Sequence, residues 1–154
     1  MTEAVEKGLG RRILVATAIA GTLDIGMAAT ETALHGKPVG RMLRGLASGA
    51  VPPAVDWGAA GALLGLAVHY AIMAVMAAVF MLLLARNDRL RAHSLVAGAV
   101  YGLGLYLFMY GLVLPIRFGA PLPSDPIAIA KGLFAHMGLV GLTFGLVARS
   151  GSAR

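Results

Sequence analysis

The chain of 154 residues contains no cysteine, a single tryptophan and few charged side chains, which make up 13% of its residues. Without cysteine there can be no disulfide, no thiol nucleophile and no thiolate metal site. Soluble domains carry about 25% charged residues, so the shortage of charge places the chain outside that class. Its length suits one domain, which we assign to residues 1–154.

Enzyme signatures are missing too. The sequence has no Gly-x-Ser-x-Gly elbow, no phosphate-binding loop, no His-Glu-x-x-His and no dinucleotide fingerprint. We therefore expect no enzymatic activity and assign no cofactor. A net charge of +6 suggests nucleic acid in a soluble protein, but here the basic residues flank apolar runs. This placement favours the lipid bilayer as the partner and no nucleic acid.

Apolar residues are abundant, at 58% of the chain with a mean hydropathy of +0.81. Residues 13–34, 59–85, 95–115 and 127–148 form runs that each reach the roughly 20 residues of a membrane helix. Backbone groups cannot stay unpaired in lipid, so these runs must be helical. The predicted fold class is all-α: a polytopic membrane protein with a four-transmembrane-helix bundle. Pro115 is expected to end the third span, and Pro126 suits the first turn of the fourth.

The first outer loop is predicted to hold a short interfacial amphipathic helix. Val39, Met42, Leu43 and Leu46 fall at helical spacing, with basic residues on the other faces. A solvated loop helix fits the same pattern, and both interpretations stay open. Trp57 stands just before the second span, where an interfacial aromatic anchor is common.

The distribution of Lys and Arg predicts the orientation. One side of the bilayer would hold Lys7, Arg11, Arg12, Arg86, Arg89, Arg91, Arg149 and Arg154; the other side would hold Lys37, Arg41, Arg44, Arg117 and Lys131. Since positive residues stay inside, both termini are expected in the cytoplasm.

Three spans carry a lone ionisable residue well inside the apolar run: Asp24, His69 and His136. Such residues are costly in hydrocarbon and are the default site hypothesis. Glu31 shares the inward stripe of Asp24, and the Tyr101 hydroxyl completes the candidate buried polar core. Convergence of the trio would create a proton-transfer pair, or a metal site with an open position. Alternatively, each residue is only a hydrogen-bond partner between helices.

The two histidines end similar strings. Gly65-Leu66 precedes His69 by the same spacing as Gly132-Leu133 precedes His136. This indicates two helical hairpins related by a pseudo-two-fold axis, with both rings at equal depth. Histidines on separate helices could also ligate a b-type haem.

Glycines at four-residue spacing predict close helix packing. The candidates are Gly61, Gly65, Gly98, Gly102, Gly141 and Gly145. The last two lie roughly opposite His136, where they are available to a neighbouring helix or to a second protomer. A homodimer or a larger membrane complex is therefore a possible state.

Several short strings of this sequence resemble those of a known group of proteins. They are Gly21-Thr22-Leu23-Asp24-Ile25, Arg44-Gly45-Leu46-Ala47-Ser48-Gly49, Gly65-Leu66-x-x-His69, Tyr101-Gly102, Leu114-Pro115 and His136. Together they resemble small bacterial four-helix inner-membrane proteins of the YagU-like group. The resemblance implies a bacterial inner membrane and supports Asp24, His69 and His136 as family features. It implies no reaction.

Three functions are compatible with this sequence. The first is a small transporter-like or proton-handling unit built around the Asp/His core. The second is an accessory or assembly subunit whose polar core is structural. The third is a haem- or metal-binding electron-transfer protein.

Overall fold

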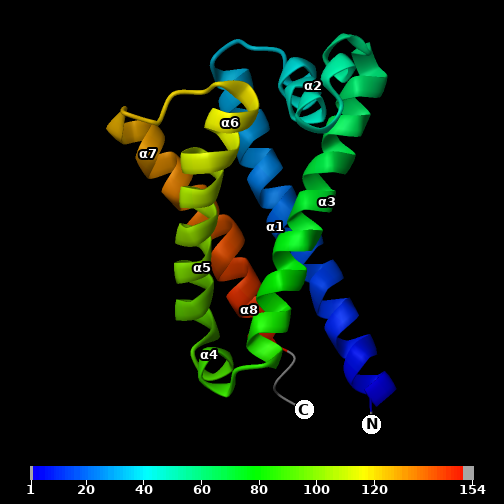
Figure 1. Cartoon of the computed structure of the whole chain (residues 1–154), viewed down its shortest axis with the longest axis vertical. Helices are drawn as coiled ribbons and strands as arrows, with labels where there is room; N and C mark the ends of the chain where they lie inside the picture. Colours follow the sequence, from blue (N-terminus) through cyan, green and yellow to red (C-terminus); the bar gives the residue numbers. More distant parts are fainter. Residues whose placement is uncertain (1, 151–154) are drawn as a thin grey trace.

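Four helical spans form the frame of the computed structural model, which describes residues 2–150 and the side chains of residues 8–150 (Figure 1). The first span is α1 (Thr2–Leu34) and the second is α3 (Gly58–Ala85). The third span comprises α5 (Ser94–Phe108), the π-helix η2 (Met109–Val113) and α6 (Leu114–Phe118). The fourth span comprises α7 (Pro126–Leu133), the π-helix η3 (Phe134–Leu142) and α8 (Thr143–Ser150). The stretches Gly8–Leu34, Gly58–Ala85, Ser94–Phe118 and Pro126–Ser150 are long and apolar enough to cross a membrane. The predicted all-α frame of four spans is therefore confirmed.

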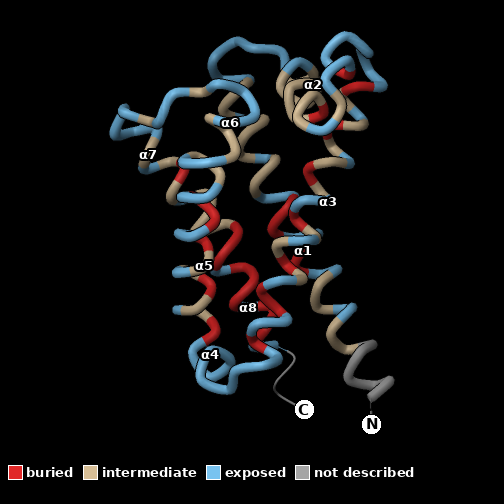
Figure 2. The backbone as a smooth tube through the Cα atoms, in the orientation of Figure 1, coloured by how far each residue is buried: buried red, intermediate tan, exposed pale blue. Residues whose placement is uncertain are grey.

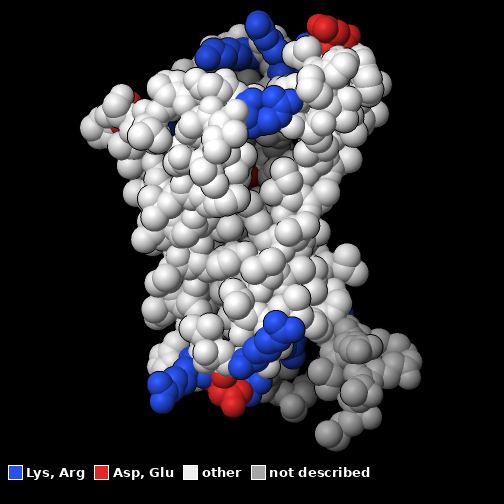
Figure 3. Space-filling view, viewed as in Figure 1, with Lys and Arg blue, Asp and Glu red and all other residues white. Residues whose placement is uncertain are grey.

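Short helices connect the spans at the two ends of the bundle. At one end, α2 (Val39–Ala50) and the 3-10 helix η1 (Pro52–Asp56) link α1 to α3; at the other, α4 (Asp88–Ala92) links α3 to α5 (Figure 1). On the face that Figure 3 shows, charged side chains gather at these two ends, and the surface between the ends is almost free of them. The exposed apolar side chains of this belt include Leu63, Val75, Val96 and Leu107.

Proline acts differently in the third and fourth spans. Pro126 begins the fourth span as predicted, and the Asp125 carboxylate caps it by accepting a hydrogen bond of 2.8 Å from the Ala128 N–H. The prediction that Pro115 ends the third span is wrong, because the helix continues to Phe118. A proline ring clashes with the carbonyl four residues earlier, and the wider turn of η2 relieves that clash.

The half of the bundle nearest the chain ends, called the packed half below, holds the apolar core (Figure 2). Its buried side chains are Ala16, Ala20, Met73, Ala77, Phe80, Met81, Leu84, Leu105, Val140, Phe144, Val147 and Ala148. The rings of Phe80 and Phe144 have centroids 5.9 Å apart and fill its centre. These rings pack α3 against α8 within the apolar core.

Glycines bring the third and fourth spans into backbone contact. A Cβ on Gly98 would clash with the Gly141 carbonyl oxygen, and a Cβ on Gly141 would clash with the Gly98 carbonyl oxygen. Gly102 and Gly145 lie equally close to carbonyls of the opposite helix. The predicted glycine faces therefore pack inside one chain, against a neighbouring helix.

The second glycine pair has an unexpected neighbour, since Gly61 and Gly65 face the loop helices rather than another span. A Cβ on Gly65 would clash with the Leu43 carbonyl oxygen in α2, and one on Gly61 would clash with the Ala54 carbonyl oxygen in η1. A helix thus forms where the amphipathic pattern predicted one, and it packs directly on α3.

The glycine contacts predict a position-specific cost of adding one methyl group. Gly98→Ala should destabilise the protein by about 1–3 kcal/mol, because the new Cβ forces α5 away from η3. Gly104→Ala in the same helix is the matched control, since no atom lies within 4 Å of its Cβ position. It should change stability by no more than about 0.5 kcal/mol. Equal unfolding curves for both variants in detergent would contradict the contact.

Candidate functional site: a polar cavity between the spans

Beyond the packed half, the spans separate around a cavity of about 600 Å³. Side chains from all four spans and from α2 line it, and most of them are apolar. Four methionines form much of the wall: Met27, Met73, Met76 and Met109. The cavity is therefore a partly open space between the spans, lined at one end by α2.

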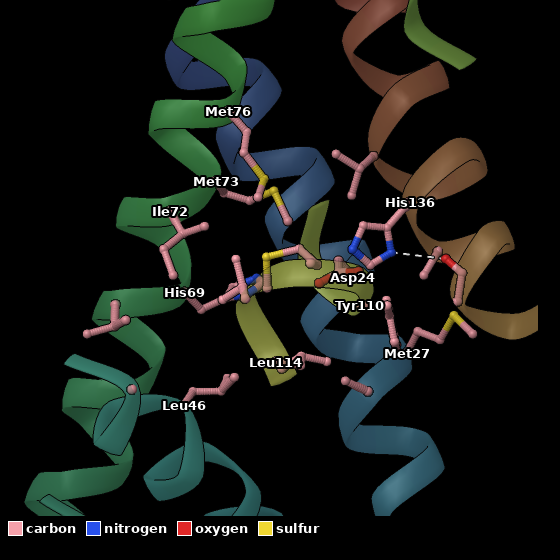
Figure 4. A pocket seen from close by; sticks show the side chains of 18 of the residues that line it. Asp24, Met27, Leu46, His69, Ile72, Met73, Met76, Tyr110, Leu114 and His136 are labelled. Atoms are coloured by element: carbon pink, nitrogen blue, oxygen red, sulfur yellow. Dashed lines mark hydrogen bonds between the residues drawn. The ribbon is translucent and has the colours of Figure 1, made fainter. Parts of the chain in front are cut away.

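The three ionisable residues singled out from the sequence all line this cavity. Asp24 comes from α1, His69 from α3 and His136 from η3, and Asp24 lies between the two rings (Figure 4). The carboxylate is within electrostatic range of both imidazoles. Tyr110 from η2 is a fourth polar group, and its ring packs edge-on against His136 with centroids 5.8 Å apart. The structure thus brings together three residues that stand far apart in the sequence.

His69 joins two spans through a buried hydrogen bond. Its Nε2 lies 3.0 Å from the carbonyl oxygen of Gly21 in α1, and its side chain is 9% exposed or less. Because a carbonyl can only accept, Nε2 carries the hydrogen. In the neutral ring, Nδ1 is then an acceptor.

His136 is held within its own helix. Its Nδ1 donates to the Gly132 carbonyl oxygen at 3.0 Å, which leaves Nε2 as the acceptor of the neutral ring. Figure 4 shows this second nitrogen directed toward the middle of the cavity. The two similar strings therefore bring both histidines to one cavity, but through different ring nitrogens and different partners.

Two π-helices shape this wall. Tyr110 belongs to η2 and His136 to η3. The π-helix is rare, and it often marks functional sites because its wider turn redirects the side chains. Periodicity cannot reveal such a turn, and the cue nearest to η2 in the sequence is Pro115.

The Asp24 carboxylate lies half-buried on the cavity wall. Within residues 8–150 it accepts no hydrogen bond and forms no salt bridge. The polar wall therefore offers the carboxylate and two imidazole nitrogens as acceptors, whereas the Tyr110 hydroxyl is its donor. This excess of acceptors is the main chemical property of the site.

Glu31 lies at the rim of the cavity rather than in its buried part. It forms an ion pair with Lys131, and the two side chains are 37% and 42% exposed. Arg117 also lies at the rim, where its Nε donates to the Gly49 carbonyl at 2.8 Å and its Nη2 to the Ser48 carbonyl at 2.6 Å. Both rim cations are therefore engaged with protein acceptors.

Tyr101 does not reach the cavity. Its hydroxyl donates to the Met76 carbonyl oxygen at 3.0 Å, and its ring lies 5.2 Å from the Phe80 ring in the packed half. Tyr110 lies nine positions farther along the same span, a rise of about 13 Å along the helix axis. Tyr110 therefore takes the place that the sequence hypothesis gave to Tyr101.

The proposed three-ligand metal site is not formed. Within the part of the chain that the structure describes, no group of three His, Asp or Glu side chains is close enough to hold a metal ion. Each imidazole is fixed to its own wall by a carbonyl, and the cavity separates the walls. The haem hypothesis stays a prediction that no contact in the cavity favours.

Neither a protein-family model, nor a curated protein, nor a solved structure matches this chain. Its function must therefore be argued from the cavity itself.

The two histidines should respond differently to the loss of their hydrogen bonds. His69→Phe keeps a ring but removes the bond between α3 and α1, and should lower stability by about 0.6–1.7 kcal/mol. His136→Phe removes a hydrogen bond within one helix and should lower the stability of the protein less. Detergent unfolding curves compare the two variants; a larger loss for His136→Phe would contradict the assigned partners.

Proposed function

We propose that the chain is a small transporter-like or proton-handling unit of a bacterial inner membrane, with Asp24 as its central ionisable group. The observation that supports it most strongly is the convergence of Asp24, His69 and His136, from three spans, on one cavity. Ionisable residues that line an intramembrane cavity characteristically mark the path of a substrate or a proton.

Hydrogen bonding favours this proposal over a purely structural core. A structural polar group gains its stability by pairing with other groups in the protein. His69 does so, but Asp24 lines the cavity and accepts no hydrogen bond from the residues that the structure describes. The accessory-subunit alternative relied on free glycine faces, and the third- and fourth-span glycines pack against each other within the chain.

We place the chain ends and α4 in the cytoplasm because that end holds more Lys and Arg. The cavity then lies toward the outer side of the membrane, and α2 lies in the outer interface. The half-buried side chains of Leu43 and Leu46 and the exposed ring of Trp57 fit this interfacial placement.

Proton movement in liposomes tests the proposal. Purified protein is reconstituted with a pH-sensitive dye inside, and a potassium–valinomycin potential drives protons inward. We expect a flux above that of protein-free liposomes, and Asp24→Asn should reduce it by at least about tenfold, because the amide cannot exchange a proton.

Tyr101→Phe is the matched control, since it removes an ionisable group outside the cavity. Its flux should equal that of the unmodified protein. Absence of flux in the unmodified protein, or an unchanged flux in Asp24→Asn, would contradict proton handling.

A further inference from the structure

We propose that the cavity binds an amphipathic organic ammonium ion, with its charged group beside Asp24, between the walls that carry His69 and His136, and its apolar part against the methionine wall. This inference rests on the proposed function, because it names the ligand class of the same cavity.

The hydrogen-bonding capacity of the wall supports an ammonium group. The wall presents the Asp24 carboxylate, Nδ1 of His69 and Nε2 of His136 as acceptors. A primary ammonium has three donors and no acceptor, so it complements this set. A carboxylate or carbonyl ligand would find the Tyr110 hydroxyl as its one donor among these four groups.

The charges around the cavity point to the same class. Lys131 is paired with Glu31 at the rim, and the Arg117 guanidinium donates to carbonyls at the end of α2. Asp24 lies deeper, where an ionised carboxylate without a partner is costly. A cation bound beside Asp24 supplies a compensating positive charge.

The remaining walls suit an apolar body. Met27, Met73, Met76 and Met109 present flexible, polarisable thioethers, which adapt to ligands of irregular shape. The Tyr110 ring adds an aromatic face that can attract a cation. A volume of about 600 Å³ is typical of small-molecule sites.

Access from the side of the bundle fits an amphipathic ligand. Figure 3 shows a hollow between α6 and α3, within the apolar belt, with an acidic side chain visible at its floor. The second span packs chiefly on α1 and α2 and only weakly on α5, so this side is the loosest. A ligand dissolved in the membrane could reach Asp24 by this route.

Binding is measured by equilibrium dialysis of protein in nanodiscs of zwitterionic lipid, with empty nanodiscs subtracted. The probes are 2-phenylethylammonium, the neutral 2-phenylethanol and the anion 3-phenylpropanoate. We expect the ammonium to bind at least about tenfold more tightly than the other two. Asp24→Asn should abolish this preference, whereas Tyr101→Phe should keep it. Equal binding of the alcohol, or tighter binding of the anion, would overturn the inference.

The trimethylated ammonium tests the N–H donors separately from the charge. It should bind several-fold more weakly, because it cannot donate to the imidazole nitrogens; equal binding would overturn their assigned role. If Asp24→Asn does not fold, His136→Phe serves instead. This substitution removes one acceptor, so it should weaken the binding of the ammonium but not the binding of the alcohol. An unchanged preference for the ammonium over the alcohol would count against the site.

Acidic pH should weaken the binding of the ammonium ion to the cavity. Protons compete with the ligand for the Asp24 carboxylate, and the groups that line the cavity with it are His69, His136 and Tyr110. The rim groups Glu31, Lys131 and Arg117 are the same in the unmodified protein and in Asp24→Asn. Affinity should therefore fall as the pH falls in the unmodified protein and stay flatter in Asp24→Asn. A rise in affinity at acid pH would contradict the inference.

The two proposals can fail separately. Selective ammonium binding without proton flux in liposomes would reject proton handling and keep the binding site. Proton flux that depends on Asp24, without ammonium preference, would reject the ligand class and keep the function.

Discussion

Direct contact between helix backbones at glycine is the interaction that determines where the spans meet and where they separate. Gly98 and Gly141 bring the third and fourth spans together, while Gly65 brings α2 onto α3. The second and third spans, by contrast, have few close backbone contacts and meet mainly through the Tyr101 side chain in the packed half. Since the large rings of Phe80 and Phe144 fill only the packed half, the other half keeps an internal space that α2 covers.

That space allows an ionisable group to remain in an apolar bundle. Asp24 lies where the packed half ends, one turn beyond the buried Ala20 and Gly21. His69 belongs to the same level, because its bond to the Gly21 carbonyl ties it to α1. Histidines held by hydrogen bonds, together with a carboxylate that accepts none within residues 8–150, make the wall rich in acceptors, and both proposals about function depend on this property.

The sequence predicts the frame of this structure well, because bilayer thickness requires a minimum apolar length and glycine spacing marks the close faces. The convergence of Asp24, His69 and His136 also followed from helical periodicity. The exchange of Tyr101 for Tyr110 did not, since periodicity gives the face of a helix but not the depth at which the bundle opens into a cavity. The partner of Gly65 was equally hidden, because a glycine pattern reveals a close contact but not which backbone makes it.

The central claim is that the cavity lies inside the bundle beside Asp24 and admits polar molecules. The absence of cysteine makes single-cysteine labelling a direct test. Ala135 lines the cavity, whereas Ala71 lies on the exposed outer face of α3. In liposomes, a cationic methanethiosulfonate reagent should modify Ala135→Cys and leave Ala71→Cys unmodified, because a thiol facing lipid is not ionised. Equal labelling of both positions, or labelling of Ala71→Cys alone, would contradict the account.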